Sequence, residues 1–203
     1  MALQSAWRER VVRENRFERL RFVAGVDVSV RGELACAAVC VLTYPDLEPV
    51  EQRLALRRVE FPYVPGLLGF REVPCIVEAF GRLEVVPDLA LVDGHGLAHP
   101  RRFGVATHLG VTLDLPTIGC AKSRLVGEHR EPAPRRGSRT RLSHEGESIG
   151  SVVRTREGVS PVYVSIGHRV DLATAVRIVL RCAPRYRLPE PIRAAHRLAG
   201  GLA

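Results

Sequence analysis

Lysine is almost missing from this chain. The sequence contains 30 lysines and arginines in 203 residues, and Lys122 is the only lysine among them. Because arginine fills every other cationic position, we expect Lys122 to lie where a compact ammonium group fits and a planar guanidinium does not. Random drift at a single position is the alternative explanation.

The sequence also lacks a zinc-binding or disulfide pattern and a segment long enough to span a membrane. The five cysteines are an odd number without a Cys-x-x-Cys pair, and most lie in apolar runs such as LACAAVCVL. This pattern favours buried thiols in a reducing compartment over a zinc site or a disulfide framework. No stretch reaches the ~20 apolar residues of a membrane span, and the N-terminus carries no apolar signal segment. We therefore expect a cytoplasmic protein without membrane contact.

The composition indicates one folded unit with a preference for polyanions. With 46% hydrophobic residues in 203, the chain can bury one large core, so residues 1–203 are interpreted as a single domain. A formal net charge of +8 and a pI near 9.9 favour attraction to nucleic acid. An arginine-rich proteome would produce the same charge, so charge alone does not decide.

Hydrophobic periodicity predicts an antiparallel start to the fold. Residues 4–20 have the spacing of an amphipathic helix. Next come two β-branched, apolar segments, RFVAGVDVSV and ELACAAVCVLTY, with a turn at Arg31 and Gly32. The alternation in PVEQRLALRRVEF predicts a third strand.

The rest of the chain alternates strands and helices. FREVPCIVEAFGRL predicts a helix with Pro74 near its first turn, and DLALVDGHG predicts a buried parallel strand that leads into a loop. A helix over 103–113 and the strand TIGCAKSRL follow. Residues 127–147 are polar and without periodicity, which is typical of a solvated loop. A second hairpin, SIGSVVRT with SPVYVSIG, precedes a helix capped by Asp171 and a terminal helix that begins near Pro191. The class is α/β with a mixed sheet.

Three acids lie where packing alone would not place them. Asp27 interrupts an apolar strand, Asp93 ends another, and Glu72 lies near the start of a helix. A buried charge costs several kcal/mol without a cationic partner, and no lysine or arginine adjoins Asp27 in the sequence. Separately, Asp27 could be a strand-end cap and Asp93 a turn residue. Together they predict a site for Mg²⁺ or Mn²⁺ suited to phosphodiester cleavage.

Histidines and Lys122 follow the same strands. His95 and His99 lie in DGHGLAHPRRFG, where either could orient or protonate a leaving oxygen. A surface imidazole without a task is the alternative for both. His168 ends another strand, where a hydrogen bond to the next helix is as good an explanation as catalysis. Lys122 ends the strand beside Asp93, from which an ammonium could reach a phosphate.

Five motifs follow one another along the chain: GVDVS, FPYVPGLLGFRE, LVDGHGLAHPRRFGVATHLG, TIGCAKSRLVG and PVYVSIGHRVDL. In this order they resemble the endonuclease V family, and the similarity continues to RYRLPEPIRAAHRLA. The resemblance implies an α/β, ribonuclease H-like fold. Its central mixed sheet would have three antiparallel strands followed by parallel strands, flanked by helices, with an additional hairpin.

The resemblance also implies roles for individual residues. The metal-binding acids would be Asp27, Glu72 and Asp93, and the catalytic group would add His99, Lys122 and His168. A wedge that enters the duplex would comprise Pro62, Tyr63, Val64 and Pro65. The pocket for the flipped hypoxanthine would be lined by Gly66, Leu67, Leu68, Gly94, His95, Gly96, Ile118, Gly119 and Ala121.

The implied activity is cleavage of the second phosphodiester bond on the 3′ side of deoxyinosine. It would use Mg²⁺, with Mn²⁺ as a substitute, and leave 3′-hydroxyl and 5′-phosphate ends. The partner would be deaminated DNA, and the resemblance leaves open whether inosine-containing RNA is the better substrate. Two alternatives are a catalytically silent reader of inosine and a less selective ribonuclease H-like nuclease. We expect a monomer.

Overall fold

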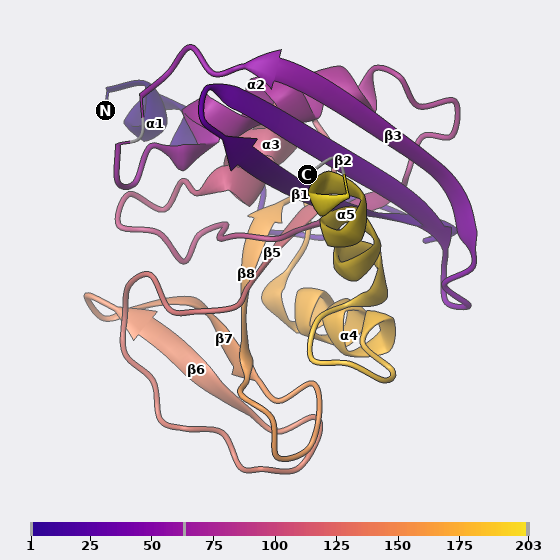
Figure 1. Ribbon diagram of the computed structural model, residues 1–203. Helices are drawn as coiled ribbons and strands as arrows, with labels where there is room; N and C mark the ends of the chain where they lie inside the picture. The colour runs from indigo at the N-terminus through magenta and orange to yellow at the C-terminus, as the bar shows by residue number, and fades with distance from the viewer. Residues whose placement is uncertain (1, 63, 202–203) are drawn as a thin grey trace.

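One mixed sheet organises the molecule (Figure 1). The computed structural model describes residues 2–62 and 64–201 and contains an eight-stranded sheet in the order β3-β2-β1-β4-β5-β8-β7-β6. Helices cover both of its faces. The predicted α/β class and the mixed sheet are confirmed.

The first three strands are antiparallel neighbours. They are β1 (Phe22–Arg31), β2 (Leu34–Thr43) and β3 (Pro49–Arg58). Gly32 has a φ of 55° in the turn between β1 and β2, a left-handed conformation that glycine adopts without a Cβ clash. The predicted hairpin and third strand are confirmed.

The centre of the sheet is parallel. Strands β4 (Leu89–Val92) and β5 (Thr117–Ala121) run parallel to β1 and to each other, and each of their residues is buried. Full burial on both faces explains their unbroken apolar sequences. Parallel strands end at one edge of the sheet, so the loops after β4 and β5 leave from the edge to which β1 brings Asp27.

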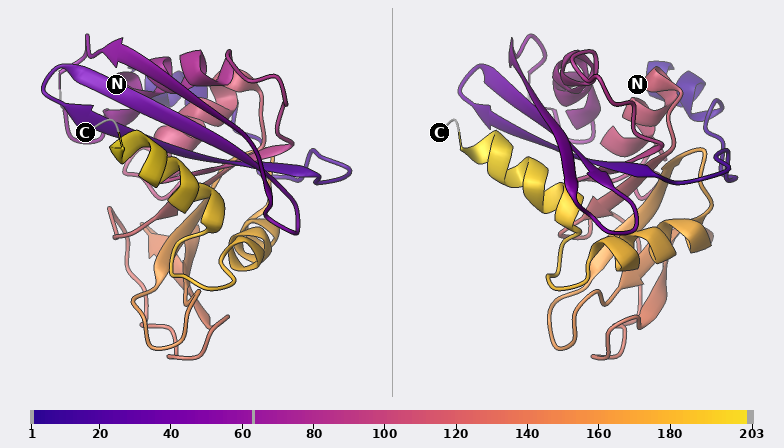
Figure 2. Two further views of the ribbon diagram at one scale, coloured as in Figure 1. Left: turned by 45° about the vertical axis from the view of Figure 1, so that its right-hand side comes forward. Right: turned by 90° about the vertical axis from the view of Figure 1, so that its right-hand side faces the viewer.

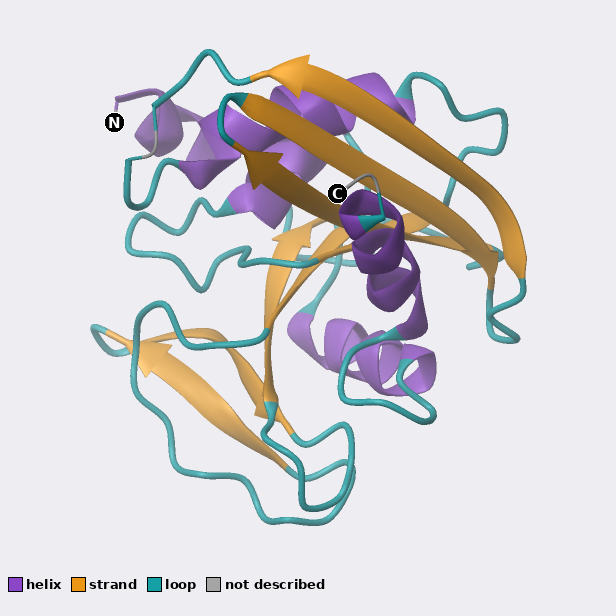
Figure 3. Ribbon diagram, in the orientation of Figure 1, coloured by secondary structure: helices purple, strands orange, loops and turns teal. Residues whose placement is uncertain are grey.

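The far part of the sheet differs from the prediction. Strand β8 (Val162–His168) pairs with β5 and with β7 (Glu147–Val153), which confirms the second hairpin. However, β7 also pairs with β6 (Arg139–His144), which lies inside the segment expected to be a loop. Leu142 is the only buried residue of this edge strand, so it carries almost no hydrophobic alternation. Residues 127–138 of that segment form no helix or named strand, as Figure 3 shows between β5 and β6.

Two helices lie on each face of the sheet (Figure 2). On one face are α2 (Leu68–Phe80) and α3 (Val105–Leu113), over a core that includes Val26. On the other are α4 (Leu172–Cys182) and α5 (Glu190–Gly200), over a core that includes Val23. The alternating residues of β1 serve both cores, which is the pattern of a three-layer α/β/α arrangement.

Local signals explain most helix boundaries. The side chain of Asp171 accepts a 2.7 Å hydrogen bond from the backbone N–H of Thr174, which caps α4 as predicted. Pro191 lies in the first turn of α5, also as predicted. Pro74 lies inside α2 and not in its first turn, at an exposed position.

The N-terminal helix is shorter than predicted. Helix α1 spans Ala2–Arg8, whereas the periodicity suggested a helix to residue 20. Beyond it, the chain is held by hydrogen bonds to the segment after β8. The Val12 carbonyl accepts from the Arg169 N–H at 2.7 Å, and the Arg16 N–H donates to the Arg169 carbonyl at 3.2 Å. Tertiary pairing has overridden a weak local preference here.

The cysteine side chains lie inside the protein. The five cysteines are free and buried, as their apolar surroundings suggested. Among residues 2–62 and 64–201, no helix combines the length and the apolar character needed to cross a membrane.

Candidate active site

The two predicted aspartates lie side by side. Val26 of β1 pairs with Val92 of β4, so Asp27 and Asp93 follow in register. The backbone N–H of Asp93 donates a 3.0 Å hydrogen bond to the carbonyl of Val26. Their side chains are only 13% and 10% exposed. The strands thus bring together two carboxylates that are distant in the sequence.

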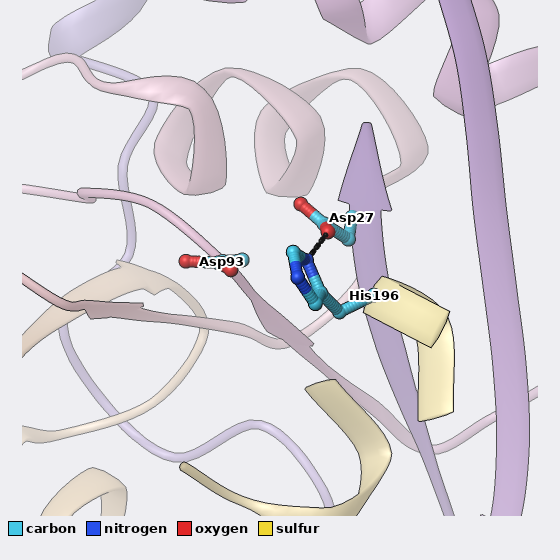
Figure 4. Close-up of side chains that lie close together, drawn as sticks. All are labelled: Asp27, Asp93 and His196. Atoms are coloured by element: carbon cyan, nitrogen blue, oxygen red, sulfur yellow. Dashed lines mark hydrogen bonds and ion pairs between the residues drawn. The ribbon is translucent and has the colours of Figure 1, made fainter. Parts of the chain in front are cut away.

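His196, which sequence reasoning did not select, completes the cluster. Its Nδ1 lies 2.6 Å from Asp27 Oδ2, although the residues are 169 positions apart. Figure 4 shows the Asp27 and His196 side chains pointing at each other with Asp93 beside them, and one ligand atom from each of the three lies within 4.8 Å of the others. The available signal was a histidine on α5 next to the buried residues Ile192 and Ala195.

Close packing of α5 on β1 delivers His196. A Cβ on Gly25 would lie 1.9 Å from the carbonyl oxygen of Pro191, so any other residue there would force the helix outward. Gly25 is two residues before Asp27 and therefore on the same face of β1. Glycine at this position lets α5 approach until His196 reaches Asp27.

Glu72 approaches the cluster from α2. It lines a shallow cavity of about 330 Å³ together with Asp27, Asp93, Lys122 and His196. Burial, followed by the negative charges of Asp27 and Asp93, raises the pKa of Glu72 to about 8. Glu72 is not among the three residues whose ligand atoms meet within 4.8 Å, so it lies farther from the centre of the site.

The acids form a site with excess negative charge. Burial raises the pKa of Asp27 and the neighbouring Asp93 raises it further, while the hydrogen bond from His196 lowers it. Mutual repulsion among buried carboxylates is what a divalent cation relieves. Carboxylate oxygens with one imidazole nitrogen fit Mg²⁺ or Mn²⁺, and Mn²⁺ accepts the nitrogen more readily.

Lys122 is at the cluster, as its position after β5 predicted. Its Nζ lies 2.6 Å from Asp93 Oδ2, and its side chain is 41% exposed. Its carbonyl accepts a hydrogen bond from Arg187 Nη2, which also donates to the carbonyl of Pro161. The ammonium is therefore placed beside the carboxylates with one side open to a ligand.

A second cavity of about 270 Å³ adjoins the acids. Gly94 and His95, which directly follow Asp93, line it, and Leu68 lines both cavities. The remaining lining residues come from the start of α2 and the loop before it, the start of α3 and the loop before it, and the loop after β5. They are Val64, Pro65, Gly66, Gly69, His99, Phe103, Gly104, Val105, Ser123, Arg124 and Leu125.

The two histidines of this cavity are held neutral by burial. Burial lowers the pKa of both His95 and His99 to about 4. Both ring nitrogens of His99 are engaged: Nε2 lies 3.1 Å from the Gly66 carbonyl, and Nδ1 accepts from the Arg101 N–H at 3.2 Å. His99 is thus held in place in the cavity wall, whereas the buried Nδ1 of His95 has no described hydrogen-bond partner.

Comparison with known proteins identifies the family. The endonuclease V family model matches residues 5–197. An endonuclease V from Roseiflexus sp. (strain RS-1) is 54% identical over 198 residues, which are 98% of this chain and 89% of that protein. The chain belongs to the endonuclease V family. It is accordingly a nuclease, with the DNA repair and DNA-binding character of that family.

Solved endonuclease V structures share the fold. The crystal structure of endonuclease V from Streptomyces avermitilis matches with a TM-score of 0.95 and 42% identity, covering 99% of this chain and 90% of that one. The endonuclease V of Ciona intestinalis was crystallised with a 24mer DNA containing an inosine followed by a ribo-adenosine. It matches with a TM-score of 0.85 and 27% identity over 99% of this chain and 95% of that one. The predicted ribonuclease H-like fold is confirmed.

Some residues expected in an endonuclease V pocket lie behind it. Gly96, Ile118, Gly119 and Ala121 are buried in the turn after β4 and in β5, next to the cavity but not on its surface. Leu67 is the residue before α2, and its backbone N–H donates to the Val64 carbonyl. In the expected wedge, Pro62 and Pro65 are exposed and Val64 is half-buried. Tyr63 lies outside the described residues.

His168 is not brought to the acids. It pairs with Thr117 at the start of β5, whereas Lys122 follows the end of that strand. Its Nδ1 accepts from the Val12 N–H at 3.2 Å, and its Nε2 lies 3.4 Å from Asp114 Oδ1. Antiparallel pairing of β5 and β8 thus carries His168 to the opposite end of the sheet, where it ties down the N-terminal segment.

Proposed function

We propose that this chain nicks DNA beside deoxyinosine. The reaction would be Mg²⁺-dependent hydrolysis of the second phosphodiester bond 3′ to the lesion, leaving 3′-hydroxyl and 5′-phosphate ends. The observation that carries the proposal is the shared wall between the acidic site and the neighbouring cavity, in which Asp93 belongs to one and Gly94 and His95 to the other.

Two adjoining sites suit one strand with a flipped base. An enzyme that acts on a lesion in a duplex must take the base out of the stack and hold it in a pocket. If the base occupied the mostly apolar cavity, the phosphates of the same strand would pass over the acidic site. Because the two sites are separate, cleavage some distance along the strand from the base fits this geometry better than cleavage directly at the lesion.

The residues of the acidic site would divide the work. Asp27, Asp93 and His196 would hold the cation, with Glu72 at the margin. Bound there, Mg²⁺ would supply charge neutralisation for the phosphate and an acidified water. Lys122 would place its ammonium against a phosphate oxygen, with its ion pair to Asp93 fixing its direction. His196 would also orient the Asp27 carboxylate.

An oligonucleotide assay tests the proposal. A duplex with one deoxyinosine should be nicked once in the presence of Mg²⁺, and enzymatic ligation of the product should confirm its 3′-hydroxyl and 5′-phosphate ends. The same duplex with adenine in place of hypoxanthine is the substrate control. An RNA strand with one inosine, run in parallel, decides which nucleic acid is preferred.

Three outcomes would contradict the proposal. Binding without any nick would make the chain a reader of inosine, and equal cleavage of the adenine duplex would make it a less selective nuclease. Activity that survives Asp93→Ala would remove that carboxylate from the mechanism. Asp46→Ala is the matched control, because Asp46 is an exposed aspartate in a different cavity.

A further inference from the structure

Three side chains converge on one carbonyl oxygen at the edge of the cavity. The oxygen of Gly66 lies 3.1 Å from Gln4 Nε2, 3.1 Å from His99 Nε2 and 2.5 Å from Arg101 Nη2. A carbonyl oxygen has two lone pairs, so three donors saturate it. We call Gln4, His99 and Arg101 the Gly66 clamp.

The members of the Gly66 clamp also hold one another. Arg101 Nε donates to Gln4 Oε1 at 2.5 Å, and the Arg101 backbone N–H donates to His99 Nδ1 at 3.2 Å. Gln4 Nε2 donates in addition to the carbonyl of Phe103 at 3.2 Å. Both the nitrogen and the oxygen of the Gln4 side-chain amide therefore make hydrogen bonds, and this residue is only 3% exposed.

Gln4 is an unusual residue to bury in so short a helix. Helix α1 has seven residues, too few to be stable alone, so its position depends on such contacts. Trp7 of the same helix packs edge-on against Phe103 and His108. Helix α1 is thus fixed to the back of the cavity, and its buried Gln4 side chain reaches Gly66.

Gly66 controls the shape of the cavity wall. Its φ is 77°, a conformation that favours glycine, and it joins the exposed segment ending at Pro65 to the start of α2. Pro65, Gly66 and Leu68 all line the cavity. Fixing the Gly66 carbonyl therefore fixes the direction in which the chain leaves the cavity toward Pro65 and Val64.

We propose that Gln4 and Arg101 are positioning residues for base recognition. By holding Gly66, they keep the cavity wall in the shape that accepts a flipped hypoxanthine, so an N-terminal helix outside the catalytic site sets lesion specificity. This inference rests on the proposed function, because it assumes that the cavity takes the base.

The geometry separates the Gly66 clamp from the chemistry. Neither Gln4 nor Arg101 lines the acidic site. The Arg101 guanidinium is directed at Gly66 and Gln4, which take two of its five donors within the protein. Loss of either side chain should therefore weaken selection of the lesion and leave the bond-breaking step intact.

Steady-state kinetics on the full chain test the proposal. Gln4→Glu keeps an acceptor for Arg101 and removes the donor to Gly66, while Gln4→Ala removes both. Each should raise KM for the inosine duplex about tenfold, because a cavity wall released from the Gly66 clamp must be ordered again when the base binds, and change kcat less than about twofold. The inhibition constant of the undamaged duplex, a measure of lesion-independent binding, should not change. Arg101→Ala should reproduce this pattern.

Arg8→Ala is the matched control, because Arg8 is an exposed residue of α1 that pairs only with Glu9 among the described residues. It should leave all three constants unchanged. Thermal unfolding of each variant verifies the fold.

Two results would overturn the inference: an unchanged KM in both Gln4 variants and Arg101→Ala, or a fall in kcat with KM unchanged. A wild-type chain that binds inosine and undamaged duplexes equally would instead overturn the proposed function, and the inference with it.

Discussion

The two ends of the central strands are built on opposite principles. At the carboxyl ends of β4 and β5, Asp27 and Asp93 lie side by side and Glu72 lines the same cavity, where burial raises the pKa of Glu72 to about 8. At the other end, His168 has a partner for each ring nitrogen. Nearby, Asp171 accepts from the Thr174 N–H, which lowers its pKa. The first end costs stability and the second supplies it.

This difference indicates which end of the strands contributes to function and which contributes to folding. Burial and neighbouring carboxylates raise the pKa values of Asp27 and Glu72, which destabilises the folded chain, so the assembly of these acids serves something other than the fold. The network around Asp171 and His168 caps a helix and ties the N-terminal segment to the sheet, which serves the fold alone. Substitutions at the two ends should therefore have opposite consequences for activity and stability.

Asp93→Asn should have the largest effect on activity of all the substitutions at the two ends. In the proposed mechanism Asp93 holds the cation that neutralises the scissile phosphate, so its loss forfeits several kcal/mol of transition-state stabilisation, and nicking of the inosine duplex should fall at least about a thousandfold. Because a repelling charge also disappears, thermal unfolding without Mg²⁺ should occur at the same or a higher temperature. A large drop in the unfolding temperature would show that Asp93 is structural.

Acid should lower the free energy of unfolding through three buried histidines, two that line the cavity and one in α3. Burial lowers the pKa of His95, His99 and His108 to about 4, whereas an unfolded histidine titrates near 6.5. The unfolded chain thus binds more protons between these values, and stability present above pH 6.5 is lost as the pH falls toward 4. The loss is at most about 3 kcal/mol per histidine.

Denaturant unfolding at a series of pH values measures this loss. His108 packs against Trp7, Phe70 and Phe103, so His108→Phe keeps an aromatic ring and removes one titrating group. The variant should lose less stability than the wild type between pH 6.5 and pH 4. Identical pH dependence in the two proteins would contradict the account.

Lys122→Arg sharpens the question raised by the one lysine. The change preserves the charge but replaces a point ammonium with a planar group beside Asp93. We expect kcat to fall about tenfold to a hundredfold, the usual range for a displaced catalytic group, and KM to change little. Unchanged kcat would mean that lysine at this position is drift.

Asp171→Ala should show the smallest effect, and only on stability. Loss of the α4 cap should cost about 1 kcal/mol of unfolding free energy, which lowers the melting temperature by about 2 to 4 °C. Values of kcat and KM on the inosine duplex should match the wild type. A loss of activity without a loss of stability would link the far end to the reaction.

The sequence predicted the parts of the site that strands deliver. Asp27 and Asp93 each stand out because a charge interrupts or ends an apolar run, and parallel strands must end at one edge. Lys122 stands out by composition. The register of β1 with β4 then brings the two acids together, which is long-range geometry that short motifs already imply.

What the sequence did not predict depends on packing. His196 reaches Asp27 because Gly25 lets α5 lie against β1, a contact across 166 positions to Pro191 that no local pattern encodes. His168 looked equivalent to other strand-end histidines, and only the antiparallel pairing of β8 with β5 separates it from the acids. Strand β6 was missed because an exposed edge strand with one buried residue has no period to detect.

The central claim is that Asp27 and Asp93 share one divalent cation. Thermal unfolding with Mg²⁺ and with a chelator tests it without any substrate, because a ligand that binds only the folded state raises the melting temperature. Mg²⁺ should stabilise the wild type and Asp114→Asn, which alters a carboxylate at the opposite end. It should have no effect on Asp27→Asn or Asp93→Asn. Equal stabilisation of all four proteins would contradict the shared site.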